Sequence, residues 1–157
     1  MTYVIIYMTY VMFIYFSTRI QYRDSHLIIP CEIAVKSVVP AIKALMAKEL
    51  VEKHGMKQDE VAELLEISQS AVSKYTRKVR GYVIKIDEID ELKPSIQKMV
   101  NLLLNGSYKR TEFLEVFCQA CITIRKTSLM CQFCQLADSN IKIEECNFCK
   151  SICPKDN

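Results

Sequence analysis

Glycine, proline and histidine are scarce in this chain, whose 157 residues include three Gly, four Pro and two His. The shortage of Gly and Pro disfavours a turn-rich β fold and favours helices. It also leaves no Gly-rich phosphate loop, and neither His lies near the clustered cysteines in the sequence. Because no domain-sized region is left to form a substrate pocket either, we expect a protein that is not an enzyme.

Charge is missing from the first 18 residues, which are dominated by Tyr, Val, Ile, Met and Phe and repeat Met-Thr-Tyr-Val at residues 8–11. We interpret residues 1–27 as translated sequence upstream of the true start. The alternative is a membrane anchor, since 18 apolar residues are at the lower limit for a span and Arg19 and Arg23 follow on the side expected to be cytoplasmic. A basic leader and a cleavage site are both lacking, so we expect a cytoplasmic protein with reduced thiols.

Residues 58–75 predict two short helices that meet at a tight turn. The apolar residues of the first helix lie three and four positions apart, as one buried helical face requires: Val61, Ala62 and Leu65. Ser68 is a good N-cap for a second helix that begins at Gln69. Val72 and Tyr75 form the apolar side of that second helix, so its polar residues are expected to face outward.

This stretch resembles the helix-turn-helix of the Cro and lambda-repressor type, the xenobiotic-response-element (XRE) family. The resemblance extends over residues 38–80, and residues 30–45 are similar to predicted archaeal regulators. The matching residues are Gln58, Val61, Ala62, Leu65, Ile67, Ser68, Val72, Ser73 and Tyr75. The resemblance implies a mainly α fold and a transcriptional regulator that binds double-stranded DNA. Glu66 departs from the family, which usually has Gly at this turn because the backbone there is left-handed.

The resemblance also implies that Gln69 and Ser70 open the recognition helix and touch bases, while Gln58 supports a phosphate contact. From their outward positions, we expect Ser73 and Lys74 to contact bases as well. The expected phosphate contacts add Thr76, Arg77 and Lys78. The net charge of the whole chain is only +3, but residues 69–80 hold four cations and no acid, as a DNA-facing surface requires. The alternative is a protein-interaction adaptor that uses the same fold without binding DNA.

Apolar periodicity predicts further helices on both sides of the motif. An apolar stripe from residue 40 ends at His54 and Gly55, and residues 94–104 and about 111–124 give two more helices. Residues 81–86 are short and β-branched, so they predict either a small strand or the start of a helix. We therefore divide the chain into an extension (1–27), a DNA-binding domain (30–81), a helical connector that could join a homodimer (82–116) and a cysteine-rich module (117–157).

Cysteine is abundant, with eight residues, of which only Cys31 lies outside the C-terminal module. The other seven form three C-x2-C doublets and a last single residue: Cys118, Cys121, Cys131, Cys134, Cys146, Cys149 and Cys153. Two intervening residues let one turn present both sulfurs to the same metal ion, at about 2.3 Å for zinc. Paired doublets, such as Cys118/Cys121 with Cys131/Cys134, would supply the four thiolates of a closed structural site.

We expect the metal to be Zn²⁺, with a [4Fe–4S] cluster as the alternative. The last three cysteines before Pro154 lack a fourth ligand, and Cys31 would complete a second site only if the fold brings it near. Zinc would fold the tail into a small compact unit, and the protein-interaction adaptor considered above would depend on zinc in the same way. An iron–sulfur cluster would make the protein a redox-sensing regulator.

Overall fold

The computed structural model describes residues 29–151, which form helices joined by loops and contain no strand. The mainly α class predicted from the sequence is therefore confirmed for this part of the chain. In chain order the elements are α2 (Pro30–Lys36), α3 (Val38–Glu52), α4 (Gln58–Leu64), α5 (Gln69–Thr76), the 3-10 helix η1 (Asp90–Leu92), α6 (Lys93–Asn105), α7 (Arg110–Lys126), α8 (Cys131–Ala137) and α9 (Phe148–Ser151).

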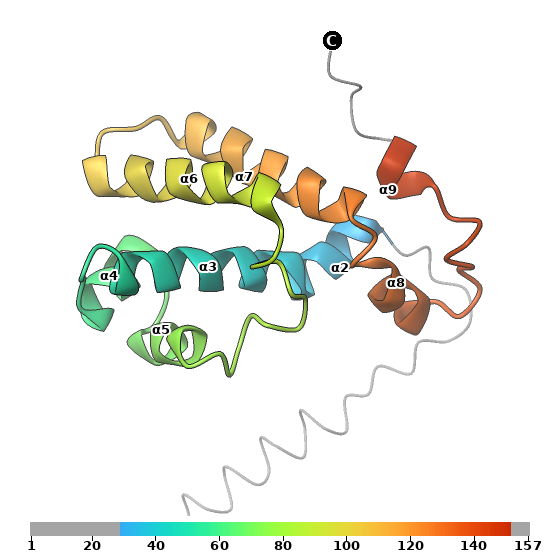
Figure 1. The fold of residues 1–157 in the computed structure, drawn as a ribbon, viewed down its shortest axis with the longest axis horizontal. Coiled ribbons are helices and arrows are strands. Elements are labelled where there is room, and N and C mark those ends of the chain that lie inside the picture. The colour runs from blue at the N-terminus through green and yellow to red at the C-terminus, as the bar shows by residue number, and fades with distance from the viewer. Residues whose placement is uncertain (1–28, 152–157) are drawn as a thin grey trace, which may run out of the picture.

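Helix α3 is the central element, and it packs against α2, α4, α5, α6 and α7. In Figure 1, α5 lies on one side of α3, and the α6–α7 pair lies on the other. The predicted apolar stripe provides the reason, because Ile42, Met46 and Leu50 are fully buried. Burial of such side chains stabilises the fold by about 1.5–3 kcal/mol each.

Helices α6 and α7 form an antiparallel pair that covers α3 (Figure 1). Pro94 lies in the first turn of α6, where its missing N–H has no helical partner to lose, and Gly106 ends the helix with a φ of 65°. The sequence predicted this helix over residues 94–104, one residue shorter at each end than the observed helix. Helix α7 buries Ala120 and Ile124 in the same core, and it runs continuously across the position where we placed the start of the cysteine-rich module.

The segment between α5 and η1 corrects one expectation. Residues 81–86 form neither a strand nor a helix, although Ile84 and Ile86 are both buried. No strand exists in residues 29–151 to offer backbone pairing, so these β-branched side chains are held by packing in an irregular segment.

None of the helices in residues 29–151 is long and apolar enough to cross a membrane. The anchor considered for residues 1–18 falls outside the described residues.

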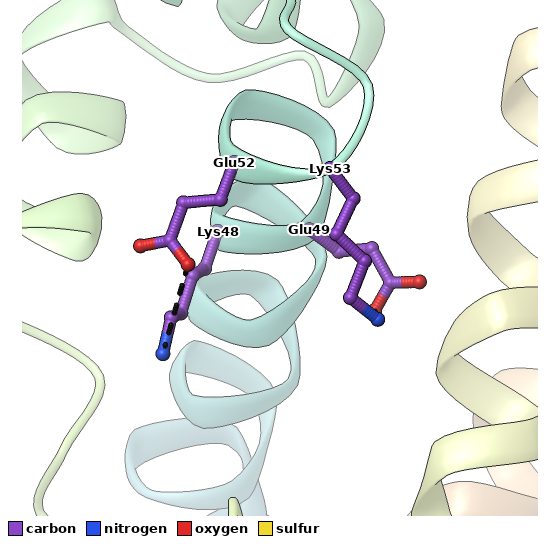
Figure 2. Close-up of polar contacts among 4 residues, drawn as sticks. All are labelled: Lys48, Glu49, Glu52 and Lys53. Carbon is purple, nitrogen blue, oxygen red and sulfur yellow. Dashed lines mark ion pairs between the residues drawn. The ribbon is translucent and has the colours of Figure 1, made fainter.

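The C-terminal turns of α3 carry two ion pairs between residues four positions apart (Figure 2). Lys48 Nζ lies 3.9 Å from Glu52 Oε2, and Lys53 Nζ lies 3.1 Å from Glu49 Oε2. Pairs of this kind on a helix surface contribute only about 0.3–0.5 kcal/mol. The position of α3 is therefore set by its buried face and not by these charges.

Candidate nucleic-acid interface

Helices α4 and α5 pack against each other and against α3 through a small apolar interface. Val61 and Val72 are fully buried, and Tyr75 is 3% exposed. The hydroxyl of Ser68 accepts a hydrogen bond from the Ala71 N–H at 3.2 Å, as expected of the N-cap of α5. The two helices predicted from the sequence are thus present, with the expected capping residue.

The turn after α4 requires a left-handed residue. The Ile67 N–H donates to the Ala62 carbonyl at 3.0 Å, and the Glu66 N–H donates to the Glu63 carbonyl at 3.2 Å. This pair of hydrogen bonds is the Schellman arrangement, which needs positive φ at its penultimate residue. Glu66 occupies that position with a φ of 51°, so the turn keeps the left-handed backbone usual in the family although its residue is not Gly. The sequence had left this geometry open.

We expect Glu66→Gly to raise the free energy of unfolding by about 1 kcal/mol, because glycine adopts positive φ without the steric cost that a side chain adds. Urea unfolding of the two proteins measures the difference. The matched control is Glu63→Gly, an exposed glutamate in helical backbone, where glycine should cost about 1 kcal/mol. Destabilisation by both substitutions would contradict the assignment of strain to Glu66.

The first residue of α5 is held by the first residue of α4. Gln69 Nε2 donates to Gln58 Oε1 at 2.9 Å; Gln69 is exposed and Gln58 is half-buried. A glutamine amide carries two N–H donors and one carbonyl acceptor. Gln69 therefore keeps one donor and its acceptor available, and Gln58 keeps both of its own amide donors available.

The other predicted contact residues follow along α5 and its C-terminal end. Ser70 is exposed, and its hydroxyl lies 3.0 Å from that of Ser68. Lys74, Arg77 and Lys78 are exposed, whereas Ser73 and Thr76 are half-buried. The Thr76 hydroxyl lies 3.2 Å from the carbonyls of Val72 and Ser73. A phosphate contact by Thr76 would therefore require its hydroxyl to leave its own helix.

The charges of the two helices are exposed and separated by sign. The acidic residues belong to α4 and its turn: Asp59, Glu60, Glu63 and Glu66. The cations follow from the last turn of α5 onward: Lys74, Arg77, Lys78 and Arg80. Such separation lets α5 approach a polyanion while the acidic residues lie on the neighbouring element. Arg77 Nε donates to the Ser73 carbonyl at 3.2 Å, which leaves the other guanidinium N–H groups for an external acceptor.

Arg80 belongs with this surface, although we did not include it among the predicted contact residues. Its guanidinium carbon lies 5.8 Å from the centre of the Tyr75 ring, and Lys78 Nζ lies 5.6 Å from the centre of the Tyr82 ring. Both contacts fall within the range of cation–π interactions. In the sequence, the only sign that Arg80 belongs to this surface was its place in a run of cations without an acidic residue. Its contact with an aromatic ring depends on the tertiary fold and could not be predicted.

The predicted metal ligands lie at the opposite end of α3 from α4, around α8, α9 and the last turns of α7 (Figure 1). Within residues 29–151, no three Cys, His, Asp or Glu side chains are already close enough together, in the rotamers present, to hold a metal ion. Cys153 lies outside the described residues. Burial raises the pKa of the Cys121 thiol to about 11, with further contributions from Cys118 and Cys31, while Arg125 opposes the rise. This thiol is therefore protonated at neutral pH.

Cys31 is brought near the C-terminal cysteines, as a shared site would require. Arg125 Nη1 donates to Cys31 Sγ at 3.8 Å across 94 positions of sequence. Burial also raises the pKa of the Cys134 thiol, and the neighbouring thiols Cys149, Cys131 and Cys146 raise it further. Arg125 again lowers this pKa. The guanidinium of Arg125 thus acts on thiols of two separate groups.

Comparison with known proteins identifies one domain. Residues 48–83 match the family described as Helix-turn-helix, of the Cro/C1 (XRE) type. The match covers the end of α3, all of α4 and α5, and the segment through residue 83. No curated protein and no solved structure matched the chain in the corresponding comparisons. The chain therefore contains a helix-turn-helix domain, which suggests a DNA-binding regulator and is generally found in regulators that are not enzymes.

Proposed function

We propose that this protein is a sequence-specific transcriptional regulator that binds double-stranded DNA with α5 in the major groove. The observation that carries the proposal is the hydrogen bond from Gln69 to Gln58, which fixes a half-free amide at the exposed start of α5. A glutamine amide reads adenine by donating to N7 and accepting from the N6 amino group. Gln69 retains both of those functions after bonding to Gln58.

Phosphate contacts would come from the two ends of this surface. The free amide donors of Gln58 lie at the start of α4, and Arg77 and Lys78 follow the end of α5. Contacts at both ends would fix the register of α5 along the groove while carrying no sequence information. A dimer remains part of the proposal, because two-fold operators present two equivalent half-sites to such helices.

The cysteine-rich C-terminal part is proposed to bind metal, with Zn²⁺ as the ion. The C-x2-C spacing of its doublets supports this assignment. Closed zinc sites of this kind contribute directly to folding, so the tail would be an architectural element of the regulator.

The test is selection of bound sequences from a random duplex pool, followed by binding to selected and scrambled duplexes between about 50 and 200 mM salt. We expect a reproducible recognition site and a steep salt dependence. A chain that selects no sequence and shows no salt-dependent binding would instead be a protein-interaction adaptor.

Arg77→Ala should weaken binding to selected and scrambled duplexes equally and reduce the salt slope by about 1. The reason is that a phosphate contact is independent of sequence and releases a counterion. Lys98→Ala is the matched control, because Lys98 is an exposed cation on α6, which lies across α3 from α5 (Figure 1). Equal effects of the two substitutions would show that only total charge matters and would remove Arg77 from the interface.

A further inference from the structure

Four of the cysteines line one small cavity between α8 and α9. The cavity has a volume of about 40 Å³. Its thiols are Cys131 and Cys134 from α8, Cys149 from α9, and Cys146 from the segment before α9. The remaining lining is largely apolar and includes Met130, Ile141 and Ile143. An apolar shell around a set of thiols is typical of a closed metal site, since it excludes water from the ligands.

The two doublets are each arranged to present both thiols together. Cys131 and Cys134 are three positions apart on α8, so they share one helical face. Cys146 and Cys149 flank the start of α9, where the N–H groups of Lys150 and Ser151 both donate to the Asn147 carbonyl at 3.0 Å. Both doublets line the same cavity, so the fold brings all four of these thiols to one place.

The first doublet lies elsewhere. Cys118 and Cys121 belong to α7, and neither is among the residues that line this cavity. The cavity therefore groups Cys131 and Cys134 with Cys146 and Cys149, and not with Cys118 and Cys121. This separation differs from the pairing of the first two doublets that we considered from the sequence.

We propose that Cys131, Cys134, Cys146 and Cys149 are the four ligands of one structural Zn²⁺ site, and that Cys118 and Cys121 are not part of it. This proposal deepens the metal-binding part of the proposed function and does not depend on DNA binding. On binding, each thiol loses its proton to solvent as its sulfur bonds to the ion. Tetrahedral coordination at about 2.3 Å requires sulfur atoms about 3.8 Å apart, so the side chains must turn further into the cavity.

The local structure gives a reason for a metal at this position. Helix α9 has four residues and buries none of them, and α8 has Cys134 as its only buried residue. Helices this short are unstable in water by themselves. A zinc ion joining α8 to α9 would supply the stabilisation that their apolar contacts lack.

The test is titration of the metal-free, full-length protein with Co²⁺, whose spectrum reports tetrahedral thiolate ligation, followed by competition with Zn²⁺. We expect Cys146→Ser and Cys149→Ser each to weaken Co²⁺ binding more than tenfold and to reduce the thiolate-to-cobalt absorption. The matched controls Cys118→Ser and Cys121→Ser should leave this site unchanged. Because Cys146 and Cys149 are only half-buried, serine at either position should fit, and circular dichroism of the metal-free variants would verify that α3–α7 remain folded.

Loss of the cobalt spectrum in the Cys118 and Cys121 variants, with retention in the Cys146 and Cys149 variants, would overturn the proposal in favour of the first two doublets. Iron and sulfide in anaerobically purified protein would overturn the choice of zinc. Binding to a selected duplex is measured on the same samples. Cobalt binding as expected without DNA binding would defeat the proposed regulator alone, and the reverse result would defeat the zinc site alone.

Discussion

Gly81→Ala is expected to lower the free energy of unfolding by about 3 kcal/mol or more. A Cβ at position 81 would lie 2.6 Å from the Ala44 Cβ and 2.7 Å from the Pro40 carbonyl oxygen. Neither atom belongs to a flexible side chain, so α3 itself would have to move. The φ of 83° adds backbone strain to the clash.

Gly106→Ala provides the matched control, because its φ of 65° is also positive but no atom lies within 4 Å of the added Cβ. That substitution should cost only about 1 kcal/mol. For a chain of this size, the difference corresponds to a melting temperature roughly 4–8 °C lower for Gly81→Ala. Equal melting temperatures for the two variants would mean that the segment after α5 does not pack closely on α3 in solution.

The same clash should reach the DNA-binding surface. The third neighbour of the added Cβ is Tyr75 Cδ1 at 3.2 Å, and Tyr75 is the buried residue of the last turn of α5. Displacing this ring would shift the end of α5 and the cations that follow it. Gly81→Ala is therefore expected to weaken DNA binding as well as stability, whereas Gly106→Ala should leave DNA binding unchanged.

The parts of the fold that were predictable from sequence are those decided within a few residues. Ser68 caps α5, Pro94 lies in the first turn of α6, and Gly106 ends it, because capping and φ preferences act locally. The resemblance placed Glu66 at the turn between the two helices, but it left open whether a non-Gly residue there would be left-handed, as the structure shows it to be.

The parts that sequence did not predict depend on contacts between distant segments. Residues 81–86 have β-branched side chains typical of a strand, yet no partner strand exists in residues 29–151, and packing of Ile84 and Ile86 decides their conformation. The sequence also gave no indication that the backbone at Gly81 packs directly against α3. Local periodicity contains no information about either contact.

The thiols show the same division. Spacing identified every doublet, since C-x2-C geometry is local, but it left open which doublets share a site. The tertiary fold groups the two doublets of α8 and α9 around one cavity and brings Cys31 to Arg125, 94 positions away in sequence. That grouping is determined by contacts between distant segments, of α8 with α2 and of α9 with α7.

Gln69→Ala is expected to weaken binding to the preferred duplex by about 1–3 kcal/mol, or about 5- to 150-fold, while binding to a scrambled duplex stays nearly unchanged. The lost interaction is a pair of hydrogen bonds to one base, so the preference should relax at a single base pair. Electrophoretic mobility shifts with duplexes varied at each position measure this change. A uniform loss on all duplexes would instead place Gln69 against the backbone.

Gln58→Ala tests whether the 2.9 Å hydrogen bond positions Gln69 for this contact. If it does, part of the base preference should be lost with Gln58, and the double variant should be less impaired than the sum of the two single variants. Coupling energies of about 0.5–3 kcal/mol are usual for residues in one hydrogen-bond network. Additive losses would mean that Gln58 contacts phosphate independently. Coupling would mean that α4 orients the residue with which α5 reads its DNA site.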